Sequence, residues 1–454
     1  MKLFGKMFFI VLSGLLVAGC AAAGNEVSSK ATLKVIYWDE SSFFANYGDL
    51  FALGHPEVEV EVVSTAALRR SGVTDETLEA FVNREQPDVL VLEIGNYEAL
   101  AAKGELTELS ALIERDQFDI NTMYPGLISM LKAKGGGKLY GLTPGFDTDV
   151  IFYNADLFAK FGVELPHDGM TWQDMMNTAR RFPAGGQGED RIYGFALGHA
   201  SSFSELALLI GSSEGLTMNR PETGALTLNS DGWKQAYRTA LNGIESGAVF
   251  DVDNEGAFSA AGDYYSGNPF LVGRAAMTTG GSHMFQDMKK AETSAAYKPF
   301  KAGAVAGPVN PAEPDKTGDM DVRNIFAIRA GSPNAEAAWE FIKFANGEKL
   351  AKVKAKTLSN GLPARMDVVK EYEGVNLDVF YKLEPRSRNN AVMSDMPPGF
   401  NEQYQRILSR ELDLVRRGSK SIDDALDTVQ AEALAAWDLA RKAQEEEEGK
   451  QSGR

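Results

Sequence analysis

The chain has 454 residues, of which 44% are hydrophobic and 24% are charged, and its formal net charge is −17. This length exceeds the size at which one hydrophobic core usually divides, so two lobes are expected. A surface this acidic repels nucleic acid and anionic lipid headgroups, which argues against both as partners of the folded body.

The N-terminus has the pattern of an export signal. Two lysines precede an apolar run from Met7 to Ala18, which is shorter than the ~20 residues that a membrane-spanning helix needs. The single cysteine, Cys20, excludes an internal disulfide framework. The sequence Val17-Ala18-Gly19-Cys20 resembles the bacterial lipobox, in which the cysteine is lipidated; the alternative is an ordinary secretory leader. We predict a signal peptide over 1–19 and a lipidated N-terminus with a tether over 20–30.

The next segment alternates strands with helices. Leu33 to Trp38 and Val58 to Val62 are expected to be strands, and the unbroken apolar run Val89 to Leu92 indicates a strand that is buried on both faces. Thr74 can cap the helix that precedes this run, and Asn96 to Lys103 is predicted to be the helix that follows it. Strands that alternate with helices favour parallel crossovers, so the first lobe is predicted to be α/β.

A crossing between lobes is predicted over Leu139 to Phe158. A glycine and proline break opens this stretch, Asp147 and Asp149 lie at its centre, and Val150 to Tyr153 has the composition of a buried strand. Because carboxylates rarely share a core with such a strand, both acids are expected near the mouth between the two lobes. Glycine and proline mark two further crossings, over Ala302 to Thr317 and over Gly361 to Ala364.

Two other segments complete the pattern. Thr171-Trp172-Gln173-Asp174 is typical of a capping box that starts a helix, and the glycines between Phe270 and His283 indicate tight turns on either side of a short strand. A long C-terminal helix is expected from Ser421 onward. We predict that the acidic residues 445–454 form a disordered tail.

Signals for an enzyme are weak. The histidines His55, His167, His199 and His283 show no metal-ligand spacing, no nucleophile elbow occurs, and Cys20 belongs to the leader. Asp147 and Asp149 have the separation of a glycosidase pair, but no second acidic cluster accompanies them. We therefore expect no catalytic residues, no metal and no cofactor. A secreted carbohydrate-active enzyme stays the alternative.

Several motifs together resemble the family 1 extracellular solute-binding proteins, the sugar-type lipoproteins of ABC importers. The resemblance covers nearly all of the mature chain in order and spacing, although each motif alone is weak. It rests on these stretches: the lipobox, Trp38, Pro87-Asp88, Tyr140 to Pro144, Tyr153 to Phe158, Thr171 to Asp174, Gly273 to Met277, and Ser332 to Ile342.

The resemblance implies an α/β fold of two lobes, a three-segment hinge and a ligand cleft between the lobes. Together with the crossings it places lobe 1 at 31–145 and 303–362, and lobe 2 at 146–302 and 363–444. The implied function is capture of a carbohydrate, expected to be an oligosaccharide, and its delivery to the transmembrane permease of an ABC transporter. The protein would be a monomer held to the cell membrane by its lipid. A ligand-presenting accessory of a sensor kinase is a further alternative.

The predicted ligand residues come from strand ends and turns. Trp38, Asp39 and Glu93 follow strands, where ligands of open α/β sheets gather, although a core tryptophan and helix capping would explain them as well. Asp147 faces the cleft by resemblance, with capping of its own turn as the alternative. Gly280, Gly281 and His283 are predicted from a turn where the family often has tryptophan, so His283 is expected to hydrogen-bond a hydroxyl group instead. Trp233, Tyr264 and Tyr265 are left open as stacking residues.

Overall fold

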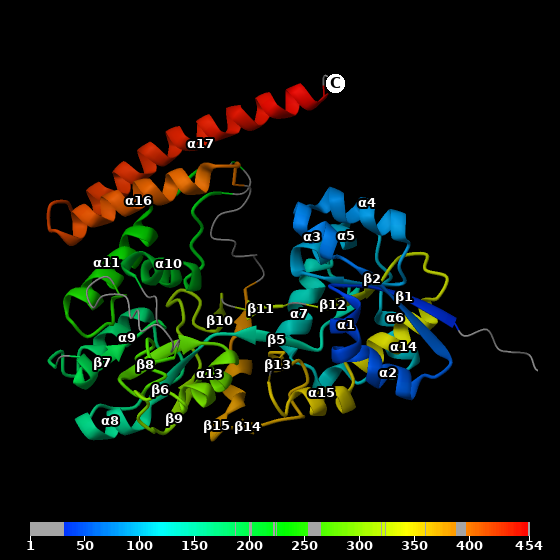
Figure 1. Ribbon diagram of the computed structural model, residues 1–454, viewed down its shortest axis with the longest axis horizontal. Coiled ribbons are helices and arrows are strands. Elements are labelled where there is room, and N and C mark those ends of the chain that lie inside the picture. The colour runs from blue at the N-terminus through cyan, green and yellow to red at the C-terminus, as the bar shows by residue number, and fades with distance from the viewer. Residues whose placement is uncertain are drawn as a thin grey trace, which may run out of the picture.

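A computed structural model describes residues 31–452, with gaps at 187, 199–201, 221–222, 224, 253–264, 319, 323, 359 and 387–395. The predicted leader, Cys20, His199 and Tyr264 lie outside these residues. Figure 1 shows two bodies side by side, which we call lobe 1 and lobe 2, with strand β5 running between them. The two-lobed α/β architecture predicted from the sequence is confirmed.

Lobe 1 is built on a five-stranded sheet of order β2-β1-β3-β12-β4. Strand β1 is parallel to β2 and β3, whereas β12 is antiparallel to β3 and β4. The central strands β3 and β12 are almost wholly buried because helices and loops cover both faces. The strands are β1 (Ala31–Tyr37), β2 (Val58–Ser64), β3 (Val89–Leu92), β4 (Gly141–Leu142) and β12 (Ile325–Ile328).

The helices of lobe 1 begin and end largely as their capping residues require. Thr74 caps α4 through the backbone N–H of Thr77, as predicted. The helical segment that follows β1 is divided by a π-helical turn, η1. The elements are α1 (Glu40–Phe43), η1 (Phe44–Gly48), α2 (Asp49–Gly54), α3 (Ala66–Ser71), α4 (Asp75–Glu85), α5 (Ile94–Ala102), α6 (Ser110–Arg115), η2 (Ile120–Thr122), α7 (Pro125–Lys134), α14 (Ala335–Ala345) and α15 (Glu348–Lys354).

Lobe 2 contains a four-stranded sheet of order β7-β8-β6-β9. Its strands are β6 (Val150–Asn154), β7 (Tyr193–Phe195), β8 (Ala275–Gly280) and β9 (Ala302–Val305). Strand β9 pairs with β6, so the predicted lobe boundary at 303 and the crossing predicted from Ala302 are placed too early. The small residues of β9 resemble a linker, but Gly303 is small because Tyr153 lies across it: an added Cβ would be 2.2 Å from the Tyr153 ring.

Helices surround this second sheet. The capping box predicted at Thr171 is present, and α16 and α17 form a hairpin whose apolar face packs on the lobe 2 core. The helices are α8 (Ala155–Phe161), α9 (Trp172–Ala179), η3 (Gly188–Asp190), α10 (Phe203–Ser213), α11 (Asp231–Glu245), α13 (His283–Ala291), α16 (Phe400–Arg416) and α17 (Ile422–Ser452). Helix α17 projects beyond α16 toward lobe 1 in Figure 1. The tail predicted to be disordered from 445 is therefore helical as far as Ser452, because glutamate, lysine and glutamine favour helix.

Three chain segments connect the lobes, and they pair with one another. Strand β5 (Gly145–Thr148) lies between β11 (Met320–Asp321) and β13 (Leu362–Pro363), with both pairings antiparallel. The predicted boundaries at 145–146 and 362–363 fall within these strands. Further short elements beside the hinge are β10 (Lys316–Thr317), β14 (Glu371–Tyr372), β15 (Val375–Asn376), η4 (Leu377–Tyr381) and β16 (Glu384–Pro385).

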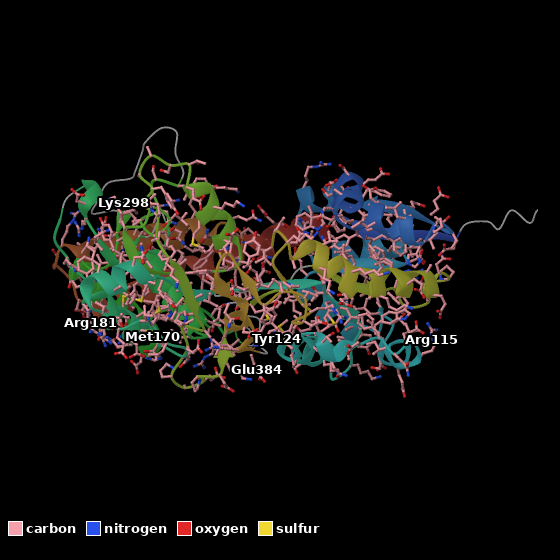
Figure 2. The ribbon with its side chains drawn as sticks, turned by 90° about the horizontal axis from the view of Figure 1, so that it is seen from below. Arg115, Tyr124, Met170, Arg181, Lys298 and Glu384 are labelled. Atoms are coloured by element: carbon pink, nitrogen blue, oxygen red, sulfur yellow. The ribbon has the colours of Figure 1, made fainter. Side chains whose placement is uncertain are left out.

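Aromatic side chains brace this connection from the side of α7. The rings of Tyr124, Phe146 and Tyr381 lie within 5.5 Å of one another, centroid to centroid. The hydroxyl of Tyr124 also donates to the carbonyl of Leu383. Figure 2 shows Tyr124 and Glu384 close together at the narrow part of the molecule between the lobes. These contacts hold β5 against the start of α7 and against η4.

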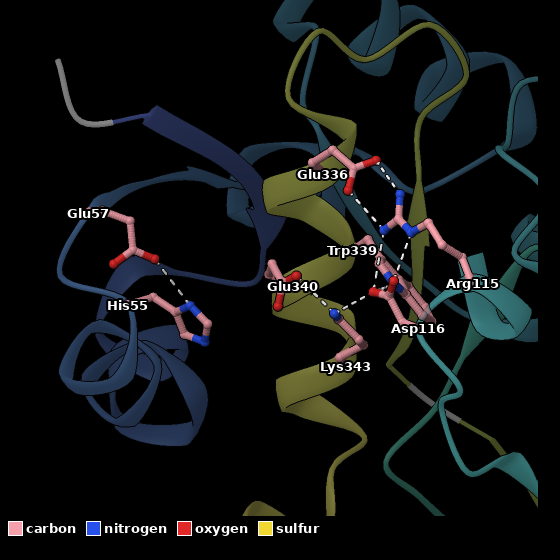
Figure 3. Close-up of polar contacts among 8 residues, drawn as sticks. All are labelled: His55, Glu57, Arg115, Asp116, Glu336, Trp339, Glu340 and Lys343. Carbon is pink, nitrogen blue, oxygen red and sulfur yellow. Dashed lines mark hydrogen bonds and ion pairs between the residues drawn. The ribbon is translucent and has the colours of Figure 1, made fainter. Parts of the chain in front are cut away.

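A charged cluster fastens α6 to α14 within lobe 1 (Figure 3). Asp116 accepts hydrogen bonds from Trp339 Nε1 at 2.9 Å and from Lys343 Nζ at 2.5 Å. Arg115 contacts Asp116 and also reaches both carboxylate oxygens of Glu336, at 2.8 and 2.9 Å. The hydrogen bonds from Arg115, and next those from Lys343, hold the pKa of Asp116 well below its usual range.

Replacing Asp116 by asparagine is expected to lower the melting temperature at pH 7. Because the folded-state pKa of Asp116 is depressed, its carboxylate stabilises the fold above the ordinary aspartate pKa of about 3.9, and this contribution is lost as the pH falls below that value. The difference in melting temperature between Asp116→Asn and the wild type should therefore shrink below pH 4. Glu59→Gln, at an exposed position of β2, serves as the control. A difference that does not depend on pH would contradict the assignment.

Candidate functional site

A cavity of about 340 Å³ lies where lobe 1 meets the hinge, and we call it the hinge pocket. Its volume is within the range of small-molecule sites. One wall follows the carboxyl end of β1, another is formed by the hinge strands, and a third by α15. Its polar and aromatic lining residues are Tyr37, Trp38, Asn46, Tyr47, Phe146, Asp147, Asp321, Asn324, Lys354 and Asn360.

Trp38 also lines a second hollow of about 500 Å³, the rim groove. Its indole is 38% exposed, which is unusual for a side chain of this size at the end of a buried strand. The guanidinium of Arg69 lies 3.8 Å from the centroid of the indole ring and donates to Glu93 Oε1 at 3.2 Å. Trp38 and Glu93, predicted separately from two strand ends, are thus joined by Arg69, which sequence reasoning missed.

The carboxylate of Asp39 is engaged in capping the helix that follows it. This carboxylate accepts from the backbone N–H and the hydroxyl group of Ser42, both at 2.8 Å, and so caps α1. These bonds, the backbone one first, hold the pKa of Asp39 below its usual range. Asp39 lines neither the hinge pocket nor the rim groove. Asp39 therefore acts as the N-cap of α1 in this structure.

Asp147 borders the hinge pocket, but its carboxylate is already engaged. Oδ1 accepts from the backbone N–H of Ser282 at 2.8 Å and from that of Thr148 at 3.1 Å, while Oδ2 accepts from the Ser282 hydroxyl at 3.2 Å. A Cβ added at Gly281 would lie 2.5 Å from Oδ1, so Gly281 is the residue that lets the carboxylate approach. The structure therefore joins the hinge to the turn after β8 through Asp147.

The other predicted residues lie apart from the two hollows. Gly280 and Gly281 are buried and line neither of them. His283 is exposed at the start of α13 and also lines neither. Trp233 is 1% exposed and donates to the carbonyl of Thr217 at 2.9 Å, so it packs in the core of lobe 2. Tyr265 is half-buried outside both hollows.

Replacing Asp147 by alanine is expected to lower the free energy of unfolding by about 2 kcal/mol, because the N–H of buried Ser282 loses its acceptor. Ligand affinity should fall as well, since the same side chain borders the hinge pocket. Asp147→Asn keeps one oxygen acceptor for that N–H and should lose less stability. Denaturant unfolding of the ligand-free variants makes the comparison. Equal stability of Asp147→Ala and the wild type would show that the bonds to Ser282 do not hold the hinge.

Within the described residues, no group of three or more histidine, cysteine, aspartate or glutamate side chains is placed to hold a metal ion. The same residues include no helix with both the length and the apolar content to cross a membrane. Two α/β lobes, a paired hinge and a pocket against that hinge are the architecture of a solute-binding protein.

The chain belongs to the family described as bacterial extracellular solute-binding protein, which matches residues 55–377. A solute-binding protein captures its ligand without converting it, so the family places the chain among binding proteins and not among enzymes, as predicted. The family resemblance read from the sequence is confirmed.

Individual relatives are distant. An arabinooligosaccharide-binding protein of Bacillus subtilis (strain 168) is 24% identical over 232 residues, which is 50% of this chain and 50% of that protein. The chain thus spans half the length of this curated relative. Among solved structures, a sugar transporter of Rhizobium etli in an open conformation has a TM-score of 0.61 at 23% identity, covering 89% of this chain and 99% of the other. The sugar-binding protein MalE of Xanthomonas citri has a TM-score of 0.62 at 18% identity, covering 91% and 99%.

Proposed function

We propose that this protein captures a carbohydrate, an oligosaccharide by preference, by closure of its two lobes. The observation that carries the proposal is the half-exposed indole of Trp38, shared by the hinge pocket and the rim groove. Sugars present flat apolar faces with hydroxyl rims, and an aromatic ring beside amides and carboxylates matches both features. Two hollows that share Trp38 favour a ligand longer than one sugar unit. The names of the Bacillus subtilis, Rhizobium etli and Xanthomonas citri proteins support the same ligand class.

Closure follows from differential binding. A ligand that contacts both lobes only in the closed form stabilises that form by its extra contacts. The hinge permits this because β5, β11 and β13 are short and pair with one another between the lobes. Asp147 and Trp38 lie on different sides of the pocket, so a sugar held between them would contact the hinge and lobe 1 together.

A screen of mono- and oligosaccharides by thermal shift tests the function. A ligand at 100 times its dissociation constant should add about 2.7 kcal/mol to the free energy of unfolding. Small-angle scattering with the best ligand should show a smaller radius of gyration than the ligand-free protein. Identical scattering curves at saturation would overturn closure, and release of shorter sugars from the ligand would favour the carbohydrate-active enzyme.

The lipid anchor and the transporter belong to the same proposal. Lipidation of Cys20 would hold the protein at the extracellular face of the cell membrane, with residues 20–30 as the tether to the folded body. Cys20→Ser should then move the protein from the membrane fraction to the medium, whereas an ordinary secretory leader predicts no change. The partner is the permease of an ABC transporter, and loss of sugar uptake on deletion of the binding protein distinguishes this role from that of a sensor-kinase accessory.

A further inference from the structure

The hinge pocket contains one feature that neutral sugars do not require. Among its described lining residues, Lys354 is the only cationic side chain. Lys354 is the last residue of α15, and its Nζ lies 4.4 Å from the centroid of the Tyr47 ring and 3.4 Å from Asn46 Oδ1. Tyr47 is 2% exposed, and its buried ring packs against the ammonium group of Lys354.

Lys354 differs from the other lysines of its helix. Lys352 is exposed and pairs with Glu348 one turn earlier, and Lys349 is exposed on the outer face. Lys354 is half-buried, and no carboxylate of the described residues lies within ion-pair distance of its Nζ. Burial lowers the pKa of Lys354 to about 8. A partly desolvated ammonium without a counter-charge is unfavourable unless a ligand supplies the charge.

The amide of Asn46 holds this ammonium group in place, and the amide of Asn360 lies beside it. Asn46 Nδ2 donates to the carbonyl of Ser42 at 2.8 Å, which fixes the orientation of the Asn46 amide. Its Oδ1 then accepts from Lys354 Nζ and, at 3.1 Å, from Asn360 Nδ2. Lys354 and Asn360 are therefore gathered around one oxygen, and each keeps further N–H groups for a ligand in the pocket.

The carboxylates of the pocket lie on the hinge. Asp147 directs its oxygens to Ser282 and Thr148, and Asp321 is exposed on β11, directly opposite Asp147 in the strand pair. The two walls thus differ in charge: the hinge wall is acidic, whereas the wall formed by η1, α15 and the loop after α15 carries the cation and the amides. A ligand with an acidic group has one orientation that satisfies both walls, whereas a neutral sugar leaves Lys354 without a counter-charge.

We propose that Lys354, with Asn46 and Asn360, recognises an anionic group on the captured sugar, either a carboxylate or a phosphate. This inference rests on the proposed function, because it names the class of carbohydrate that the same pocket takes. The acidic group would lie against Lys354 and Asn360, and the sugar rings would extend past Trp38 toward the rim groove.

The test compares matched neutral and acidic sugars by calorimetry at pH 7. The probes are galactobiose against digalacturonate for the carboxylate, and maltose against maltose 6′-phosphate for the phosphate. At least one acidic probe should bind ten or more times as tightly as its neutral partner, and the pair that responds identifies the source of the charge. Lys354→Gln should abolish this preference, Lys354→Arg should keep most of it, and Lys352→Gln should leave it unchanged.

The outcomes separate this inference from the function on which it rests. Neutral probes that bind as tightly as acidic ones, or a preference that survives in Lys354→Gln, would overturn the role of Lys354 and leave carbohydrate capture standing. If no neutral or acidic sugar binds, both proposals fall together. Melting curves of ligand-free Lys354→Gln control for folding, and this variant should be at least as stable as the wild type because it no longer buries an unpaired charge.

Discussion

Replacing Trp38 by alanine is expected to weaken carbohydrate binding roughly 30-fold or more, which corresponds to about 2 kcal/mol. The indole is the exposed aromatic surface shared by the hinge pocket and the rim groove, so its removal takes away a stacking face at the centre of the ligand path. Arg69 loses its ring contact in the same variant. Calorimetry at 25 °C with the best sugar from the screen provides the measurement.

Two further variants distinguish the loss of the stacking ring from a nonspecific effect of substitution in lobe 1. Trp38→Phe keeps an aromatic face and should retain much of the affinity. Leu53→Ala removes an 81% exposed side chain of α2 in the same lobe, away from both hollows, and should leave binding unchanged. An affinity of Trp38→Ala within twofold of the wild type would remove Trp38 from the site and, with it, the observation on which the proposed function depends.

The largest loss of stability is expected from Gly194→Ala. Gly194 lies in β7, where α9 passes directly over the strand, and an added Cβ would be 2.1 Å from the carbonyl oxygen of Ala179 and 2.4 Å from its Cα. Backbone atoms cannot turn aside as the end of a flexible side chain can, so α9 has to move off the sheet. We expect a loss of about 3 kcal/mol in the free energy of unfolding.

Denaturant unfolding of the ligand-free protein measures this effect, and Gly54→Ala is the control. Gly54 ends α2, and no atom lies within 4 Å of a Cβ added there, so this variant should be as stable as the wild type or slightly more stable. Similar stabilities for the two variants would mean that α9 and β7 can separate at little cost.

Much of the fold could be predicted because the local amino-acid composition of many segments matches the place that those segments take in the fold. The apolar run at Val89 to Leu92 becomes a strand buried between its neighbours, and the glycine and proline break leads into β5, the first hinge segment. The predicted crossing between lobes was placed wrongly at its start, where the composition of a segment does not match its place in the fold. Ala302 to Val305 has the small residues of a linker, yet it is a strand because β6 has an edge to pair and Tyr153 needs the space above Gly303.

The residues around the two hollows also differ in how far the sequence alone could suggest them. Trp38 and Glu93 could be proposed as ligand residues because strand ends can be recognised in a sequence. Arg69 could not, since its place between them depends on how α3 folds back over the sheet. Lys354 is one of several lysines in α15, and nothing in the local sequence separates it from Lys352. Asp147 was identified, but its partner Ser282 lies 135 positions away, and only the folded hinge brings the two together.

The hydrogen bonds of Asp147 link one wall of the hinge pocket to lobe 2. Through Ser282, this carboxylate is tied to the end of β8 in lobe 2, whereas Trp38 and Lys354 on the opposite walls belong to lobe 1. A change in the angle between the lobes would therefore move Asp147 relative to Lys354 and so change the width of the pocket. If the proposed permease recognises the closed form, that recognition depends on whether the sugar fits the gap between Asp147 and Lys354.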